Sequence, residues 1–373
     1  MNEDLLTPLR DVDVRPPRVD LGQAIRVGRR RRRIRQAAIA GLAAAAVLAT
    51  AVAVNAVTGQ PRSMPADRTP VPLPTSTIAP PLGDCTPGPA DAPYLSRHPW
   101  VVLDDTWRVA VHLDAPGTAP VEAVRYTDGR VERIPDVPSR FQVALVNRAG
   151  DFAGVHSKVE RGWVYRDGRF IELKLPGGAT HVALTDINEA GDILGSVDTG
   201  KVGGYEGVVW PAGHPDRPRL LKAPAGKIAR GAGIAWDGTV VGTVIDQGTA
   251  TPYLWQPDGT GEPLPVPAEL GQSVEVSNLT GDWAVGPKIR WNIRTRHADV
   301  INGMDKWSVV DVYGRVFGTT ETAEHRAVVW INGTVQPVQR SEGLRAGIEF
   351  VRHDGRQMLS QASTGEWVRW TCS

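Results

Sequence analysis

The sequence predicts an all-β fold, a seven-bladed β-propeller ectodomain that follows a single N-terminal transmembrane helix, and two recurring markers support this prediction. A glycine that closes a tight turn, or a residue in its place, recurs about 33 to 47 residues apart, at Trp107, Gly150, Gly191, Gly238, Gly281, Gly314 and Gly355. An aromatic residue that ends a short apolar run recurs about 36 to 45 residues apart, at Tyr126, Tyr165, Trp210, Trp255, Trp291, Trp330 and Trp370. A period near forty with four short strands per unit is typical of a propeller blade, because solenoid repeats of that length are helical.

The count of seven units depends on two weak ones. In the first unit Trp107 stands where most units have the turn glycine. In the fifth unit only about ten residues separate Gly281 from Trp291, which is short for two strands and a turn. A six-bladed propeller is therefore the alternative.

The clearest unit runs from Ala183 to Trp210. An apolar run ends at Asn188, Gly191 closes a turn, and a second run stops at Gly195 before a third ends at Trp210. We interpret these runs as successive antiparallel strands, with Gly191 at positive φ. The glycines that stop the second run are expected to permit close approach of neighbouring blades. They are Gly154, Gly195, Gly242, Gly286 and Gly318.

Residues 1–36 form a basic leader, which we expect to lie in the cytoplasm. Ten arginines and five acidic residues precede residue 37, whereas the whole chain has a formal net charge of +1. The basic excess is therefore local. It lacks interleaved aromatic residues, so we expect no nucleic-acid partner. The leader is interpreted as a topogenic signal.

Residues 37–57 are twenty-one positions without a charged side chain, and we predict that they form the transmembrane helix. At about 1.5 Å per residue they cover roughly 30 Å, the thickness of the hydrocarbon core. The arginines before them place the N-terminus in the cytoplasm. The alternative is a cleaved signal peptide, since Val54 to Ala56 resembles a small-residue cleavage site, but the leader is long and partly acidic for that.

Residues 58–99 are predicted to form a stalk. They contain eleven of the thirty prolines, mixed with Thr, Ser and Ala. Proline favours extended polyproline II structure, so the part from Gly59 to Asp84 is expected to act as a spacer of about 3.1 Å per residue. A proline-recognition ligand is the alternative.

Residues 100–373 are predicted to form the propeller, and the two cysteines bracket its repeats. Cys85 ends the stalk, and Cys372 follows the last unit. The chain stops three residues after Trp370, so the outer strand of the last blade is expected from Asp84 to Arg97. Such a strand would bring the cysteines together, and we interpret them as an intramolecular disulfide on the oxidising side of the membrane. An intermolecular bond or two free thiols are the alternatives.

Known catalytic and metal-binding motifs are absent from the sequence, so we predict no catalytic, cofactor-binding or metal-binding residue. Neither a nucleophile elbow, a phosphate-binding loop nor a zinc motif is present. The acids Asp104, Asp105 and Asp186 are candidates for a shared channel, but acids at strand ends are usually solvated turn residues. The histidines are scattered without metal-ligand spacing. They are His98, His112, His156, His181, His214, His297, His325 and His353.

Two stretches resemble known families. The hairpin from Asp186 to Gly195 and the run from His325 to Gly333 resemble HAF repeats, named for a His-Ala-Phe run followed by Trp and a turn glycine. The leader, with its Leu5 to Arg10 start and its Gly28 to Arg33 end, resembles that of actinobacterial membrane proteins, some encoded beside extracytoplasmic-function sigma factors. The resemblance implies a membrane-anchored extracellular β-propeller without an assigned reaction.

Three functions are consistent with these features. The first is a non-catalytic, single-pass membrane protein of the cell envelope, in which the propeller binds an unknown envelope protein or glycan as a monomer without cofactors. The second is a transmembrane regulator linked to an extracytoplasmic-function sigma factor. The third is a glycan or lactone hydrolase on the axial face of the propeller.

Overall fold

The computed structural model describes a repetitive all-β unit that begins within the proline-rich region. The described residues belong to one compact unit, Asp67–Ser373. The described residues are 78–89, 101–103, 109–113, 122–127, 130–138, 141–156, 161–200, 204–304, 309–320, 327–338, 348–352, 354–361 and 367–373. The predicted leader and transmembrane helix lie outside them. Within the described part, no helix is long and apolar enough to cross a membrane.

The described strands form seven antiparallel sheets of four strands each, which we number in chain order. The first contains β2 (Val101–Leu103), β3 (Val109–Leu113), β4 (Glu122–Thr127) and β5 (Arg130–Ile134). The second contains β6 (Phe141–Val146), β7 (Phe152–His156), β8 (Gly162–Arg166) and β9 (Arg169–Leu173). The third contains β10 (Val182–Ile187), β11 (Ile193–Asp198), β12 (Tyr205–Trp210) and β13 (Arg219–Leu220). The fourth contains β14 (Ile228–Ile234), β15 (Val240–Asp246), β16 (Thr249–Trp255) and β17 (Gly261–Pro263).

The last three sheets follow the same order, except that the seventh takes one strand from the start of the unit. The fifth contains β18 (Asn278–Thr280), β19 (Trp283–Gly286), β20 (Ile289–Asn292) and β21 (Ala298–Val300). The sixth contains β22 (Val309–Val310), β23 (Val316–Thr319), β24 (Ala327–Ile331) and β25 (Thr334–Pro337). The seventh contains β26 (Ile348–Val351), β27 (Gln357–Gln361), β28 (Trp367–Cys372) and β1 (Cys85–Pro89). A short 3-10 helix, η2 (Ala268–Leu270), precedes the fifth sheet.

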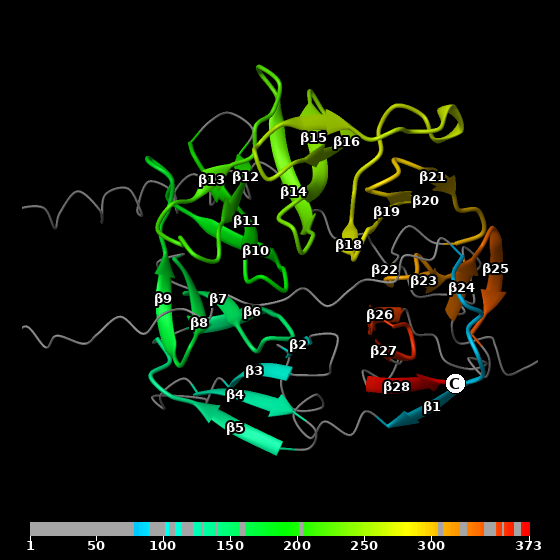
Figure 1. Ribbon diagram of the computed structural model, residues 1–373, viewed down its shortest axis with the longest axis horizontal. Helices are drawn as coiled ribbons and strands as arrows, with labels where there is room; N and C mark the ends of the chain where they lie inside the picture. Colours follow the sequence, from blue (N-terminus) through cyan, green and yellow to red (C-terminus); the bar gives the residue numbers. More distant parts are fainter. Residues whose placement is uncertain are drawn as a thin grey trace, which may run out of the picture. The chain divides into compact units, whose positions relative to one another are not determined.

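Within this unit the sheets are arranged as the blades of a propeller. Figure 1 shows the first strand of each blade nearest a common centre and the last strand outermost. The inner strand of each blade packs across the strands of the preceding blade, as β14 does on β10, β11 and β12, and β10 on β6 and β7. The predicted seven-bladed β-propeller is confirmed, and the six-bladed alternative is excluded.

The repeated tryptophans lie on the third strands and connect neighbouring blades. Trp210, Trp255 and Trp291 are almost wholly buried. Each donates its indole N–H, at 2.7 Å, to a backbone carbonyl just after the outer strand of the preceding blade. We call the contact between two neighbouring blades a seam. Because a buried indole N–H needs an acceptor, the same tryptophan supplies both apolar area and a fixed hydrogen bond at each of these seams.

The turn glycines have positive φ, as the sequence predicts. Gly150, Gly191 and Gly238 have φ values of 84°, 89° and 83°. The amide of each donates at 2.9 Å to the carbonyl three residues earlier, which closes the turn between the first and second strands. A residue with a side chain is strained at these φ values.

The expectation for the glycines that stop the second strand is corrected. A side-chain carbon at Gly154, Gly195 or Gly242 would meet a backbone carbonyl of the first strand in the same blade, rather than a neighbouring blade. That first strand has a register shift opposite each glycine, and the bulge brings its backbone close. The close approach between blades occurs instead at Gly231, which faces Leu194, and at Gly233, which faces Leu279.

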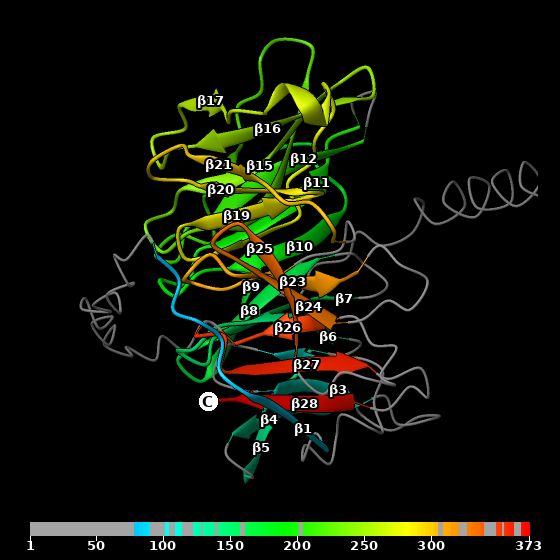
Figure 2. The same cartoon turned by 90° about the vertical axis from the view of Figure 1, so that its right-hand side faces the viewer.

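The outer strand of the seventh blade comes from the start of the unit, within the range that the sequence predicts. β1 pairs with β28 in antiparallel register, with Cys85 opposite Cys372 and Pro89 opposite Val368. Figure 1 and Figure 2 both show the blue β1 beside the red β28. The chain therefore closes the ring by joining segments from its two ends in one sheet.

The segment before β1 packs on the propeller, so the predicted spacer does not extend to Asp84. We call Ile78–Asp84 the strap. Ala79 is 3% exposed and belongs, with the adjacent Leu82, to a core cluster that includes Phe317 and Trp370. The amide of Ser373 donates to the Asp84 carbonyl at 3.2 Å. Ala79 and Leu82 pack against the sixth and seventh blades, whereas Ile78 is exposed. The proline content alone does not reveal this packing.

Candidate functional site

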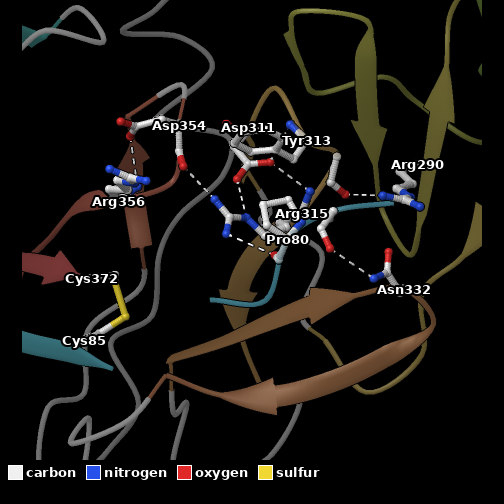
Figure 3. A network of polar contacts seen from close by, with 12 residues as sticks. Pro80, Cys85, Arg290, Asp311, Tyr313, Arg315, Asn332, Asp354, Arg356 and Cys372 are labelled. Carbon is white, nitrogen blue, oxygen red and sulfur yellow. Dashed lines mark hydrogen bonds and ion pairs between the residues drawn. A yellow bond between two sulfur atoms is a disulfide. The ribbon is translucent and has the colours of Figure 1, made fainter. Parts of the chain in front are cut away.

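The two cysteines form a buried disulfide at the closing blade. Cys85 and Cys372 are 1% and 4% exposed, and their sulfur atoms are bonded across 287 residues of chain. They occupy the first residue of β1 and the last residue of β28. Figure 3 shows this bond next to a network of polar contacts between the sixth and seventh blades.

The centre of that network is a buried ion pair between Arg315 and Asp311. The side chains are 4% and 0% exposed, and Arg315 Nε donates to Asp311 Oδ2 at 2.6 Å. Arg315 also donates to the Asp354 carbonyl at 2.6 Å and to the Pro80 carbonyl at 3.4 Å (Figure 3). Burial raises the pKa of Asp311, and the guanidinium of Arg315 opposes that shift. One side chain thus joins the sixth blade, the seventh blade and the strap.

A second strap contact comes from the outer turn of the sixth blade. Asn332, at a φ of 48° in the turn between β24 and β25, donates its amide to the Ala79 carbonyl at 3.2 Å. Asn tolerates this left-handed conformation better than most residues. The strap is therefore held by side chains that hydrogen-bond its backbone, so these bonds do not depend on the strap's own side chains.

Buried arginines also join blades elsewhere in the ring. Arg166 donates to Asp151 Oδ2 at 2.9 Å and to the Gly191 carbonyl of the third blade at 2.6 Å. Arg290 donates to the Gly314 carbonyl of the sixth blade, and its guanidinium carbon lies about 4 Å from the ring centroids of Trp283 (4.2 Å) and Trp330 (4.1 Å). Burial lowers the pKa of Arg290, and Asp299 opposes the shift.

The turn asparagines also join neighbouring blades, through a side-chain amide that donates to a backbone carbonyl of the next blade. Asn147 donates its side-chain amide to the Asn188 carbonyl at 3.0 Å, from the second blade to the third. Asn188 donates in turn to the Ala235 carbonyl at 2.8 Å, from the third blade to the fourth. These asparagines are buried, and each carbonyl also accepts the amide of its own turn glycine, so the asparagine supplies a second bond that joins the two blades.

Asp186 is the sequence candidate that the structure places at a seam. It lies on β10, and its oxygens accept the backbone amides of Ile187 and, from the fourth blade, Ile234, both at 2.8 Å. Burial raises the pKa of Asp186 to about 6, against the opposing effect of these two hydrogen bonds, and Glu189 adds to the rise. Its contacts make it a link between inner strands. Asp104 and Asp105 lie outside the described residues.

The histidines are not brought together in the described part of the chain. His181 Nδ1 lies 2.6 Å from Thr180 Oγ1, and His297 Nε2 lies 3.1 Å from Asp299 Oδ1. His156 ends β7, His214 lies between β12 and β13, and the backbone of His112 belongs to β3. Within the described ranges no three His, Cys, Asp or Glu side chains form a group that could hold a metal ion. His98, His325 and His353 lie outside those ranges.

Sequence reasoning missed the buried arginines, because they occupy different places in the repeat. Arg166 ends a third strand, Arg290 lies within one, and Arg315 follows a turn glycine. A periodic pattern predicts the tryptophans and turn glycines, because they recur at the same place in successive repeats. An arginine whose place in the repeat differs from one blade to the next produces no periodic pattern.

Comparisons with known proteins give structural similarity without a family assignment. No protein-family model and no curated protein matches the chain. Virginiamycin B lyase from Staphylococcus aureus is 12% identical with a TM-score of 0.45, over 77% of this chain and 99% of that chain. The β-propeller domain of the Trilobed protease from Pyrococcus furiosus is 13% identical with a TM-score of 0.47, over 78% and 96%. YCF48 bound to D1 peptide is 14% identical with a TM-score of 0.47, over 80% and 100%. At these values the fold assignment rests on the seven sheets themselves.

Proposed function

We propose that the protein is a membrane-anchored, non-catalytic binding module of the cell envelope, with an unknown envelope protein or glycan as its partner. The observation that carries the proposal is the closing blade, where the disulfide, β1 and the Arg315 network hold both ends of the propeller together. A ring closed in this way is a rigid platform for binding. The disulfide is consistent with an oxidising compartment.

The use of the buried charges supports a binding role over a hydrolytic one. Asp311 and Asp151 each accept a hydrogen bond from a guanidinium that also bonds the next blade. Asp186 has a raised pKa, which suits a general acid, but each of its oxygens accepts a backbone amide. These carboxylates hold the blades together, and a catalytic acid needs an oxygen directed at substrate.

The proposal includes single-pass topology, with the leader of residues 1–36 in the cytoplasm, residues 37–57 in the membrane and the propeller outside. The propeller is proposed to be monomeric and built from HAF-like repeats. The hairpin from Asp186 to Gly195 and the segment from Ala327 to Gly333 supply the described part of that resemblance. Fusion of alkaline phosphatase after Ser373 should give an active reporter, and activity from a cytoplasm-dependent reporter instead would reverse the topology.

The binding role is tested by the melting temperature of the full-length protein with and without cell-wall fragments. Ligand at a hundredfold excess over Kd stabilises a folded protein by about 2.7 kcal/mol, which corresponds to roughly 4 °C for a unit as large as Asp67–Ser373. A shift of this order with cell-wall fragments, and none with a matched amount of serum albumin, is expected. Hydrolysis of the fragments by the protein would replace the binding role with an enzymatic one.

A further inference from the structure

One tryptophan departs from the pattern of buried aromatic residues. Trp236 lies in the turn between β14 and β15 and is 41% exposed, whereas the third-strand residues Trp210 and Trp255 are 0% and 1% exposed. Within the described part of the chain, its ring has no aromatic, cation or hydrogen-bond partner. A large, flat, apolar surface is therefore left open to solvent.

The same turn position carries charged residues in the two preceding blades. Arg148 and Glu189 occupy it in the second and third blades, and they form an ion pair at 2.8 Å. In the fourth blade Trp236 takes this place. The turn that carries Trp236 joins β14, the innermost strand of the fourth blade, to β15.

The residue that follows Trp236 in the same turn is tied to the fifth blade by ion pairs. Arg294, in the turn between β20 and β21, donates to Asp237 Oδ2 at 2.6 Å and to Asp282 Oδ1 at 2.8 Å. Burial alone would raise the pKa of Asp237, but hydrogen bonds from Arg294 and Thr239 outweigh it and hold the pKa below its ordinary value. Asp237 therefore stays an ionised acceptor. The neighbouring pair of Arg296 and Glu262 gives the cluster one more carboxylate than guanidinium groups.

We propose that Trp236, Asp237 and Arg294 form a carbohydrate-binding subsite for a neutral pyranose, a proposal that rests on the binding function proposed above. The axial C–H groups of a pyranose fit the face of an indole, while a carboxylate and a guanidinium hold adjacent hydroxyl groups through charge-assisted hydrogen bonds. The excess carboxylate repels an anionic sugar. A cationic peptide would meet a guanidinium beside each carboxylate, Arg294 at Asp237 and Arg296 at Glu262, which disfavours it.

The test measures binding of three neutral tetrasaccharides, namely chitotetraose, cellotetraose and maltotetraose, to the full-length protein by isothermal titration calorimetry. At least one should bind, and tetragalacturonic acid should bind more weakly. Trp236→Ala should weaken the best neutral ligand about tenfold. Asp237→Asn should weaken it by a smaller factor, because it retains one acceptor oxygen.

The matched control is Tyr205→Ala. Tyr205 is 39% exposed at the start of β12, so it removes a similar exposed aromatic surface away from the Trp236 turn, and it should leave affinity unchanged. Circular dichroism confirms that each variant is folded. No binding of any neutral tetrasaccharide, equal affinity of the Trp236→Ala protein, or Trp236-dependent binding of tetralysine instead would each overturn the subsite. Cell-wall fragments that stabilise wild type and Trp236→Ala equally would leave the proposed function standing while removing this site, whereas fragments that stabilise neither would remove the function.

Discussion

Two seams of the propeller use the same chemistry for different purposes. Between the second and third blades, Arg166 binds Asp151 and donates to the Gly191 carbonyl of the next turn. Between the sixth and seventh blades, Arg315 binds Asp311 and donates to the Asp354 carbonyl of the next turn. Both pairs are buried, with side chains at most 7% exposed.

The difference lies in the third contact of the guanidinium. Arg166 donates to the Ala212 carbonyl, which belongs to the next blade along the chain. Arg315 donates to the Pro80 carbonyl, which lies 235 residues away in sequence. An internal seam thus joins neighbouring repeats, whereas the closing seam joins chain ends whose approach costs loop-closure entropy. Long-range contacts of this kind make the ring cooperative.

The largest effect is expected from the disulfide, which exists only at the closing seam. In the chain-entropy model, a cross-link across 287 residues stabilises by roughly 5 to 6 kcal/mol, an upper estimate. Domains are commonly stable by only about 5 to 15 kcal/mol. Cys372→Ser, or reduction, should therefore lower the melting temperature sharply in calorimetry of the full-length protein.

Mass spectrometry without reductant provides the control for that experiment. A monomer lighter by two hydrogens, with the peptides of Cys85 and Cys372 joined, is expected. A covalent dimer or two alkylatable thiols would show that Cys85 and Cys372 do not form an intramolecular disulfide at the closing seam. An unchanged melting temperature after complete reduction would show that β1 and the strap close the ring without the bond.

The buried ion pairs give a matched comparison of the two seams. Asp311→Ala and Asp151→Ala each leave a buried guanidinium without its carboxylate, which costs about 3 to 5 kcal/mol. Both should lower the midpoint of urea unfolding by similar amounts. Only Asp311→Ala should also speed proteolysis at the strap, because Arg315 holds Pro80. Equal proteolysis of the strap in both variants would mean that the Arg315 contact does not restrain it.

The sequence predicts the internal seams better than the closing seam. The spacing of Trp210, Trp255 and Trp291 predicts both the blade count and the residues that fill each seam. The position of Cys85 and Cys372 outside the repeats predicts that the outer strand of the last blade comes from upstream. The strap contacts of Arg315 and Asn332 could not be predicted, because both side chains bind backbone carbonyls of the strap. Every residue has a backbone carbonyl, so the sequence does not indicate which one is bound.

Asp186 at the third and fourth blades provides a pH test of an internal seam. Its carboxylate faces backbone amides, whereas that of Asp311 faces a guanidinium. With a folded pKa of about 6 and an ordinary value of 3.8, the folded state binds more protons than the unfolded state between these values. Stability should therefore fall as pH rises through this window, by roughly 3 kcal/mol or less. Urea unfolding across pH 4 to 7 should show this slope in wild type and a flatter one in Asp186→Asn. An equal slope in the variant would assign the pH dependence to another group.

The smallest expected effects on stability come from the two asparagine contacts, Asn188 at an internal seam and Asn332 at the closing seam. Asn188→Ala removes the donor to the Ala235 carbonyl and the acceptor of the Asp192 amide. It should cost about 1 to 3 kcal/mol because the Asp192 amide loses its acceptor, although the Ala235 carbonyl still accepts the Gly238 amide. Asn332 is exposed, and water can replace its bond to the Ala79 carbonyl, so Asn332→Ala should cost at most about 1 kcal/mol. Amide hydrogen exchange in the strap should nevertheless be faster in Asn332→Ala than in wild type, since local opening needs less free energy than global unfolding. In Asn188→Ala the exchange rate of the strap should be unchanged. If Asn332→Ala leaves strap exchange unchanged, Arg315, the buried Ala79 and the disulfide hold the strap without it, and the closing seam depends on its buried contacts alone.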